Sequence, residues 1–319
     1  MPKVSVVIPA YNAMIYLPDT LASVLQQTFT DFEVFIINDG STDNIKQWAT
    51  QIVDPRVKLI SQQNQGVSAA RNTGIAHSTG EFVAFLDADD LWKPTKLEKQ
   101  VHCLEDNSAV GLVYTWTAFI DQSGKFTGIL LANHVEGNVW EQIVVLDMIS
   151  TGSSPMVRRN CFDTVGLFDP NIRGGEDRDM WSRIAAHYPF KVVKEPLTLY
   201  RRHSSNTTKN SNKMLQELRL VIEKTFQSAP IELLYLRTRS YGWMNIFAAW
   251  SSLLDESNLN QAMHYRQQAI LHYPQLRYTS IYIRLSLAIA ITYSFGTQGY
   301  ARLQRMTHRL RRLMLDVAT

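Results

Sequence analysis

The apolar positions in the first ninety residues predict short buried strands that alternate with helices. Residues 4–8, 31–37 and 57–61 are mainly apolar runs of strand length, and Pro9 is expected to end the first of them. Between the first two runs, apolar side chains recur at helical spacing, at Leu17, Leu21, Val24 and Leu25. This alternation favours an α/β fold with a mixed, mainly parallel, Rossmann-like sheet flanked by helices.

A further strand-like run, residues 82–86, ends in three carboxylates within four positions, Asp87, Asp89 and Asp90. Ligands of open α/β sheets bind beyond the carboxyl ends of the strands. Asp87 and Asp89 are spaced to offer oxygen ligands to one divalent cation, which would offset the repulsion between these like charges. The alternative is a solvated acidic turn in which Asp90 caps the next helix.

The second hundred residues predict more strands and a second acidic segment. Residues 111–120 form a long apolar run, and residues 191–193 and 197–200 are two shorter strand-like stretches. Small polar residues at 149–155 either let an acceptor approach or form an ordinary loop. Residues 173–181 open a helix with several acids, which the helix dipole would stabilise at that position.

Charge is divided unevenly along the chain. Residues 1–200 carry 16 Lys and Arg against 23 Asp and Glu, a net charge of −7, whereas residues 201–319 carry 16 against 6, a net charge of +10. This division suggests that the first part handles cations and that the second meets an anionic partner, a membrane surface or nucleic acid.

The cysteine content and the ends of the chain suggest a cytoplasmic protein. Cys103 and Cys161 are the only cysteines and form no CxxC motif, which favours a reducing compartment. Only three residues precede the first predicted strand, so we expect no signal peptide. No apolar run approaches the roughly 20 residues that a spanning helix needs.

The sequence lacks the common nucleotide-binding motifs but contains five others. Neither G-x-G-x-x-G after the first strand nor G-x-x-x-x-G-K-[ST] is present, which excludes a dinucleotide fingerprint and a P-loop. Five other motifs occur in a fixed order: Val7-Ile8-Pro9-Ala10-Tyr11-Asn12, Asn38-Asp39-Gly40-Ser41-Thr42-Asp43, the segment 64–74 with Asn64, Gly66 and Ala70-Arg71-Asn72, Asp87-Ala88-Asp89, and Gly175-Glu176-Asp177-x-Asp179-Met180-Trp181.

Together these motifs resemble those of the family 2 inverting glycosyltransferases of the GT-A fold, over about residues 3–205. The resemblance implies a nucleotide-diphosphate sugar donor, with a UDP-sugar expected, a divalent metal, Mn²⁺ or Mg²⁺, and inversion at the anomeric carbon. Such a front end gives no reason to expect nucleic acid as a partner.

The resemblance also implies roles for individual residues in donor binding. Tyr11 would stack on the base, and Asp39 would accept a hydrogen bond from the base N3–H. Arg71 would reach the base or the diphosphate. The same donor site would include Pro9, Ala10, Asn12, Asn64, Ala88 and Asp87, the last of these on the ribose.

For the chemistry, the resemblance implies that Asp89 is the main metal ligand, with Asp87 and His203 as further ligands. Asp177 is the first choice for the general base that deprotonates the acceptor hydroxyl, and Glu176 is the second. Trp181, Asp179 and Ser153 are candidates for acceptor contacts. Trp181 could equally be a core residue, and Asp179 could instead orient the helix.

We expect a catalytic domain over residues 1–210, with a nucleotide-binding half at about 1–100 and an acceptor half at about 101–210. Residues 211–319 would form a basic, mainly helical region. The end of the chain predicts an amphipathic helix. Its apolar side would carry Leu303, Met306, Leu310, Leu313 and Val317, and its other side would carry Arg302, Arg305, Arg309 and Arg312.

That pattern fits either a helix on the inner face of the cytoplasmic membrane or a contact between subunits of a homo-oligomer. The membrane alternative would make the acceptor a lipid-linked glycan, and otherwise the acceptor is a glycan. The apolar run at residues 285–295 could be a helix or a strand. Two other functions remain as alternatives, a non-catalytic carbohydrate-binding relative and a sugar nucleotidylyltransferase.

Overall fold

The structure is a computed structural model that describes residues 1–149, 151–203, 211–227, 229–254, 257–296 and 299. The chain forms two compact units, residues 1–207 and residues 208–319.

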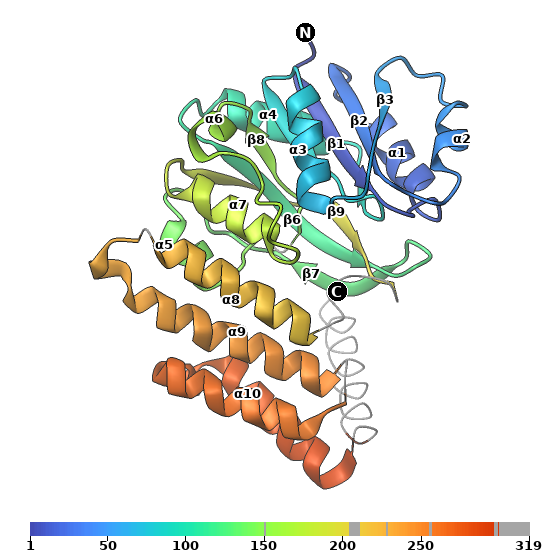
Figure 1. Ribbon diagram of the computed structural model, residues 1–319. Helices are drawn as coiled ribbons and strands as arrows, with labels where there is room; N and C mark the ends of the chain where they lie inside the picture. Colours follow the sequence, from blue (N-terminus) through green and yellow to red (C-terminus); the bar gives the residue numbers. More distant parts are fainter. Residues whose placement is uncertain (150, 204–210, 228, 255–256, 297–298, 300–319) are drawn as a thin grey trace, which may run out of the picture. The chain divides into compact units, whose positions relative to one another are not determined.

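The described part of the first unit is built on one mixed sheet of nine strands. Its strands are β1 Val4–Ala10, β2 Phe32–Asp39, β3 Val57–Gln62, β4 Phe82–Phe85, β5 Leu91–Trp92, β6 Leu112–Ile120, β7 Phe126–Leu131, β8 Met156–Arg158 and β9 Phe190–Arg201. Their order is β3-β2-β1-β4-β8-β6-β9-β5, and β7, which is off this path, also pairs with β6. The predicted α/β fold class is therefore confirmed (Figure 1).

Helices cover both faces of this sheet. They are α1 Leu17–Leu25, α2 Ile45–Ala49, α3 Val67–His77, α4 Lys96–Glu105, α5 Trp140–Val145, α6 Cys161–Val165 and α7 Glu176–Ala185. Apolar side chains of α1 and α4 share one core cluster with Val6, Ile8 and Val34 of the sheet. On the opposite face, Gly74 of α3 lies against Val7, where a Cβ would come within 2.2 Å of the valine methyl carbon. The view in Figure 1 looks onto the face that carries α3 and α7.

Strands β1, β2, β3 and β4 are parallel, so their carboxyl ends lie at one edge of the sheet. The prediction that Pro9 ends the first strand is wrong, because β1 continues to Ala10 and pairs Pro9 with Ile37. The Val7 carbonyl points toward β4, where it accepts the Leu86 N–H. The backbone of Pro9, two residues later, points to the same side, at a level beyond the last residue of β4. Its missing N–H therefore costs no hydrogen bond of the sheet.

The two strand-like stretches near residue 195 form a single strand, β9, which pairs in parallel with β6. The register shifts where Trp116 of β6 lies opposite Pro196, and the two strands continue their pairing beyond this irregularity. Because β9 runs on to Arg201, it carries His203 to the edge where β4 ends.

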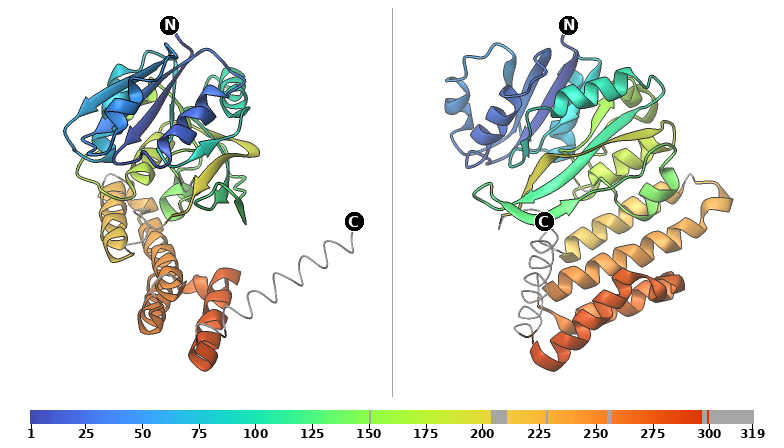
Figure 2. Two further views of the ribbon diagram at one scale, coloured as in Figure 1. Left: turned by 90° about the vertical axis from the view of Figure 1, so that its right-hand side faces the viewer. Right: turned by 180° about the vertical axis from the view of Figure 1, so that it is seen from behind.

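The second unit is helical in its described residues, with α8 Ser211–Gln227, α9 Tyr235–Leu254, α10 Leu259–His272, two short 3₁₀ helices at Ile231–Leu233 and Pro274–Tyr278, and a further helix over residues 280–296. In Figure 2 α8, α9 and α10 lie side by side. Leu285, Ala288 and Ile289 pack with α9 and α10, so the run at 285–295 is helical and faces a core of its own unit. The arginine-lined stripe at 302–317 lies outside the described residues.

Among the described helices, none is both long enough and apolar enough to cross a membrane.

Candidate active site

The loops after β1 and β2 are tied together at the carboxyl edge of the sheet. Asn12 adopts a left-handed backbone conformation, with φ of 50°, and its side-chain oxygen accepts the Thr42 N–H at 2.8 Å. The Asn12 N–H in turn donates to Ser41 Oγ at 3.0 Å. These bonds hold the neighbouring Tyr11 in place while its ring stays 54% exposed, as a surface for stacking would require.

Asp39, at the end of β2, is buried and organises the start of α3. Its carboxylate accepts the backbone N–H groups of Gln65 and Gly66 at 3.0 and 2.8 Å and the Gln62 side-chain amide at 2.8 Å. A carboxylate offers about four acceptor positions, so one remains for a ligand N–H. The loop it holds includes Asn64, which is exposed.

Pro9, Ala10 and Ala88 were predicted to belong to the donor site, and the structure buries their side chains. Ala10 and Ala88 are part of the core cluster beneath the site. These residues can therefore contribute only backbone groups to a ligand.

Arg71 connects the two acidic segments of the sequence. Its guanidinium donates to Asp87 Oδ1 at 2.7 Å and to Glu176 Oε1 at 2.8 Å, and its side chain is 3% exposed. Burial lowers the pKa of Arg71, but Asp87 and Glu176 raise it to a net value above the ordinary one, so the guanidinium stays charged. A Cβ on Gly152 would lie 2.5 Å from this guanidinium, so the close approach requires glycine.

Asp89 and His203 form a second contact at the site. His203 Nε2 lies 2.8 Å from Asp89 Oδ2, and the imidazole packs 4.9 Å from the Tyr16 ring. Burial and the charge of Asp87 raise the pKa of Asp89, although the contact with His203 opposes this effect. Arg201 donates from Nε to the Asp89 backbone oxygen at 2.8 Å and so holds the loop that carries this carboxylate.

Asp90 does not have the role that the alternative interpretation, a solvated turn, gave it. It is fully buried, and it does not cap a helix, because β5 follows it and α4 begins at Lys96. Its carboxylate accepts the Ser153 hydroxyl at 2.6 Å and the Arg201 N–H at 2.9 Å. Burial, followed by the charges of Asp89 and Asp87, raises the pKa of Asp90 well above its ordinary value.

Ser153, proposed for acceptor contacts, is fully buried beneath this loop. Its hydroxyl oxygen accepts the Asp87 N–H at 3.0 Å, and its carbonyl accepts the Trp92 indole N–H at 2.8 Å. The structure places Ser153 as a support for the acidic loop rather than at a surface that an acceptor could reach.

Helix α7 begins directly with the second acidic segment, after Gly175 in a left-handed conformation with φ of 78°. Asp177 is half-buried, and its Oδ1 accepts the Arg178 N–H at 2.8 Å. Burial, followed by the charges of Glu176 and Asp147, raises the pKa of Asp177 to about 7, against the opposing charge of Arg71. A carboxylate with this pKa is suited to accept a proton near neutral pH.

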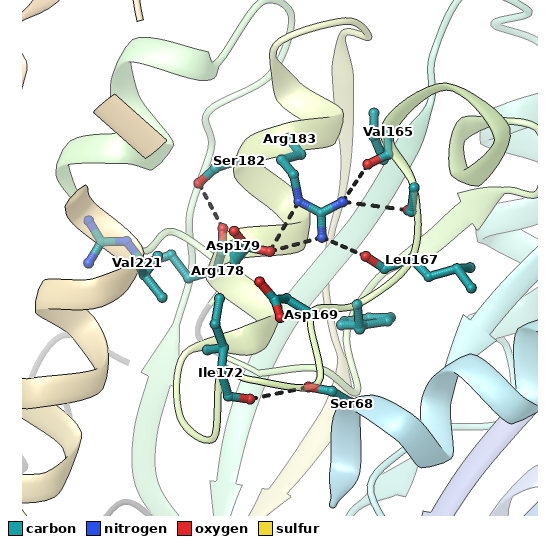
Figure 3. Close-up of polar contacts among 12 residues, drawn as sticks. Ser68, Val165, Leu167, Asp169, Ile172, Arg178, Asp179, Ser182, Arg183 and Val221 are labelled. Atoms are coloured by element: carbon teal, nitrogen blue, oxygen red, sulfur yellow. Dashed lines mark hydrogen bonds and ion pairs between the residues drawn. The ribbon is translucent and has the colours of Figure 1, made fainter. Parts of the chain in front are cut away.

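Asp179 and Trp181 point into the protein. Figure 3 shows the buried Asp179 paired with Arg183, which also donates to the carbonyls of Val165 and Leu167. The Arg183 Nη2 and Nε atoms lie 2.9 and 3.1 Å from Asp179 Oδ2. Trp181 is 1% exposed and packs edge-on against Phe168, with ring centroids 5.9 Å apart. Of the two roles left open for each residue, these contacts favour orienting the helix for Asp179 and a core position for Trp181.

A divalent cation at this site would need ligands from the donor and from water as well as from the protein. Within the part of the chain that the structure describes, no three His, Cys, Asp or Glu side chains are grouped to hold a metal. Asp89 and His203 are adjacent and Asp87 is tied to Arg71, so the chain offers one or two ligands. Mg²⁺ and Mn²⁺ sites that bind phosphates commonly use this few, with phosphate oxygens and waters completing the shell.

The fold is that of the GT-A-type glycosyltransferases. The crystal structure of residues 1–349 of TarS from S. aureus is similar, with a TM-score of 0.63 at 15% identity over 96% of this chain and 91% of that one. The mannosyltransferase PcManGT from Pyrobaculum calidifontis, in complex with GDP-Man and Mn²⁺, gives a TM-score of 0.59 at 19% identity over 93% and 88% of the two chains. At these identities the likeness concerns the fold alone.

Residues 5–165 match the profile of Glycosyl transferase family 2, and the chain belongs to that family. An uncharacterized glycosyltransferase from Haemophilus influenzae is 30% identical over 225 residues, 65% of this chain and 68% of that protein. One from Rickettsia bellii is 35% identical over 68% of this chain and 31% of that protein, and E. coli chondroitin synthase is 30% identical over 65% and 30%. The chain thus spans about a third of the length of several of these relatives.

The family that the motifs resembled is therefore confirmed as the family of this chain.

Proposed function

We propose that this protein is a metal-dependent inverting glycosyltransferase that moves a sugar from a nucleotide-diphosphate donor, a UDP-sugar, to an acceptor hydroxyl of a glycan or glycolipid. The observation that carries the proposal is the contact of Arg71 with both Asp87 and Glu176. One buried guanidinium brings the end of β4 and the start of α7 together, so a group that binds the donor and a group that activates the acceptor face one site.

The donor would bind along the carboxyl edge of β1, β2 and β4. The exposed Tyr11 ring would cover the base, and the open acceptor position of Asp39 would receive the N3–H of uracil. Asn64 would contact the nucleotide from the loop that Asp39 holds. A TarS structure in complex with UDP-GlcNAc shares this fold, with a TM-score of 0.59, which is consistent with a UDP-sugar.

Asp89, together with His203, would hold Mn²⁺ or Mg²⁺ against the phosphates of the donor. When bound, such a cation stabilises the negative charge that develops on a departing nucleoside diphosphate. Arg71 and Arg201 would keep the acidic loop in position, the first through Asp87 and the second through the Asp89 carbonyl.

Asp177 would act as the general base. Inversion requires a carboxylate on the face of the sugar opposite the leaving group, within about 3 Å of the acceptor hydroxyl. Two differences favour Asp177 over Glu176. Glu176 is paired with Arg71, whereas the Asp177 carboxylate accepts only the Arg178 backbone N–H among the described residues. The pKa of Asp177 is also raised to about 7.

The proposal is tested with purified protein and a panel of nucleotide sugars, by measuring slow donor hydrolysis with Mn²⁺, with Mg²⁺ and with EDTA. We expect one UDP-sugar to be hydrolysed faster than the others, and only when a divalent cation is present. Hydrolysis that continues unchanged in EDTA would refute the metal requirement, and exclusive use of a GDP-sugar would refute the choice of UDP.

A lipid-linked acceptor is proposed from the basic, amphipathic pattern at residues 302–317, which lies outside the described residues. If this segment binds the inner face of the cytoplasmic membrane, the protein should float with anionic vesicles at low salt, and deletion of residues 298–319 should abolish flotation without changing donor hydrolysis. Full-length protein that stays at the bottom of the gradient would instead favour the homo-oligomer, which sedimentation can then check.

A further inference from the structure

The helical unit contains a polar pocket of about 290 Å³ that the proposed transfer reaction does not use. Three helices line it: α8 with Arg219, α9 with Tyr241 and Asn245, and α10 with His264, Tyr265 and His272. Tyr241 and Asn245 are one helical turn apart, as are Tyr265 and Gln268 on the facing helix. The pocket is thus built from aligned faces of regular helices and lies within one unit.

The charge of the pocket is positive. Its lining includes no carboxylate among the described residues, and the guanidinium of Arg219 makes no hydrogen bond or ion pair with them. The nearest acid on α8, Glu223, is already paired with Arg237 at 2.7 Å and accepts a short hydrogen bond from the Tyr241 hydroxyl. Arg219 is therefore available to an anion from outside.

Asn245 offers the pocket a hydrogen-bond acceptor. Asn245 is 3% exposed and lines the pocket, and its amide nitrogen donates to the Tyr241 carbonyl at 2.8 Å. No described group donates to its side-chain oxygen. This oxygen can therefore accept a hydrogen bond from a ligand hydroxyl in the pocket.

Aromatic rings complete the surface. The Tyr241 ring stacks on His272 with centroids 5.1 Å apart and an interplanar angle of 22°. Burial and then the charge of Arg219 lower the pKa of His272, which leaves a neutral ring at pH 7. Flat aromatic faces beside hydrogen-bonding side chains suit a sugar ring, which has apolar C–H faces and a polar edge.

We propose that this pocket binds an acidic sugar residue, one that carries a carboxylate or a phosphate, within a glycan held by the enzyme. Arg219 would pair with the anionic group, Asn245 would accept a sugar hydroxyl, and the aromatic rings would contact the sugar ring. The volume is at the lower end for small-molecule sites and fits a single sugar unit. The role of the glycan as an acceptor rests on the proposed function, whereas the binding itself does not.

The test is ligand-observed NMR titration of the full chain with saturating UDP present to occupy the donor site. The four probes are glucuronic acid, glucose 6-phosphate, glucose and inorganic phosphate. We expect an acidic sugar to bind about tenfold more tightly than glucose or phosphate, the range of one charge-assisted hydrogen bond. The tighter of the two acidic sugars identifies the anionic group as carboxylate or phosphate.

The deciding variant is Arg219→Gln, which should remove the preference for the acidic sugar. Its matched control is Arg284→Gln, which removes the same charge from an exposed position of the same unit outside the pocket and should leave binding unchanged. Thermal melts establish that both variants are folded. Equal affinity in wild type and Arg219→Gln, or equal binding of glucose, would overturn the proposal.

Donor hydrolysis measured in the same samples separates this inference from the proposed function. Binding that depends on Arg219 in a protein that hydrolyses no UDP-sugar would leave the pocket assigned and the donor proposal refuted. Hydrolysis of a UDP-sugar by a protein that binds none of the four probes would support the donor proposal and refute the pocket proposal.

Discussion

The acidic segment at the end of β4 and the acidic segment at the start of α7 each carry three carboxylates within four positions. In each segment one acid pairs with Arg71, which bonds Asp87 on one side and Glu176 on the other. A second acid is buried against structural partners, Asp90 in the first segment and Asp179 in the second.

The remaining acid of each segment, Asp89 or Asp177, is only partly buried and is not paired with an arginine. The two segments differ in backbone, because one follows a strand and the other opens a helix. In both segments, nevertheless, one acid pairs with Arg71, one is buried and one is only partly buried. The difference between acids of one segment therefore comes from the neighbours that the fold supplies, and the predictions below test that division.

The largest effect is expected from Asp89→Ala. Loss of this carboxylate removes the acid that His203 contacts, so transfer should fall below detection and UDP should no longer bind more tightly with Mn²⁺ than without it. Calorimetric titration of UDP with and without the metal measures this. Asp163→Ala, at an exposed position of α6, is the control, and unchanged metal-dependent affinity in Asp89→Ala would remove Asp89 from the site.

Asp177→Asn should reduce turnover by roughly 10²–10⁴-fold with little change in donor affinity, because a general base acts in the transition state. Glu176→Gln keeps an oxygen for Arg71 and should cost less. Single-turnover rates and UDP titrations of both variants compare the two acids. Full activity in Asp177→Asn together with inactive Glu176→Gln would reverse the assignment.

The pKa of about 7 for Asp177 predicts an acidic limb in the pH–rate profile. Below pH 7 the carboxylate takes up a proton, so kcat/KM should fall by up to tenfold per pH unit. The free energy of unfolding depends on pH in the opposite direction. Between the ordinary carboxyl pKa of 3.8 and about 7, the folded state binds more protons than the unfolded state. The free energy of unfolding therefore decreases as the pH rises through that range. Asp177→Asn should flatten both profiles, and melts and rates measured at several pH values will show it.

The smallest effect on chemistry and a clear effect on stability are expected from Asp179→Ala. Removing the buried partner of Arg183 should lower the free energy of unfolding by about 1–3 kcal/mol while donor affinity per folded molecule stays the same. Thermal unfolding measures the loss, and Asp163→Ala again serves as the control. A stable variant that loses turnover would mean that Asp179 acts on the acceptor.

Local sequence was sufficient for the elements that depend on local pattern. The β-branched run of β1 and the apolar run of β4 are buried strands, and the ordered motifs identified the family. Boundaries that depend on long-range pairing were less accurate, because β9 is continuous only where β6 pairs with it across Pro196.

The sequence by itself determined which residue types lie at the strand ends and at the start of α7, since hydrophobic periodicity and motif order are local properties. Only the tertiary structure decided which acid of each segment is available. Asp90 could not be separated from its neighbours by spacing, because Ser153 and Arg201 reach it through the fold. Arg183, by contrast, lies four residues after Asp179 on the same helix, a spacing that the sequence does show, and only the burial of Asp179 is decided by the fold. A carboxylate's pKa depends on burial and on charges brought from elsewhere in the chain, and only folding brings them together.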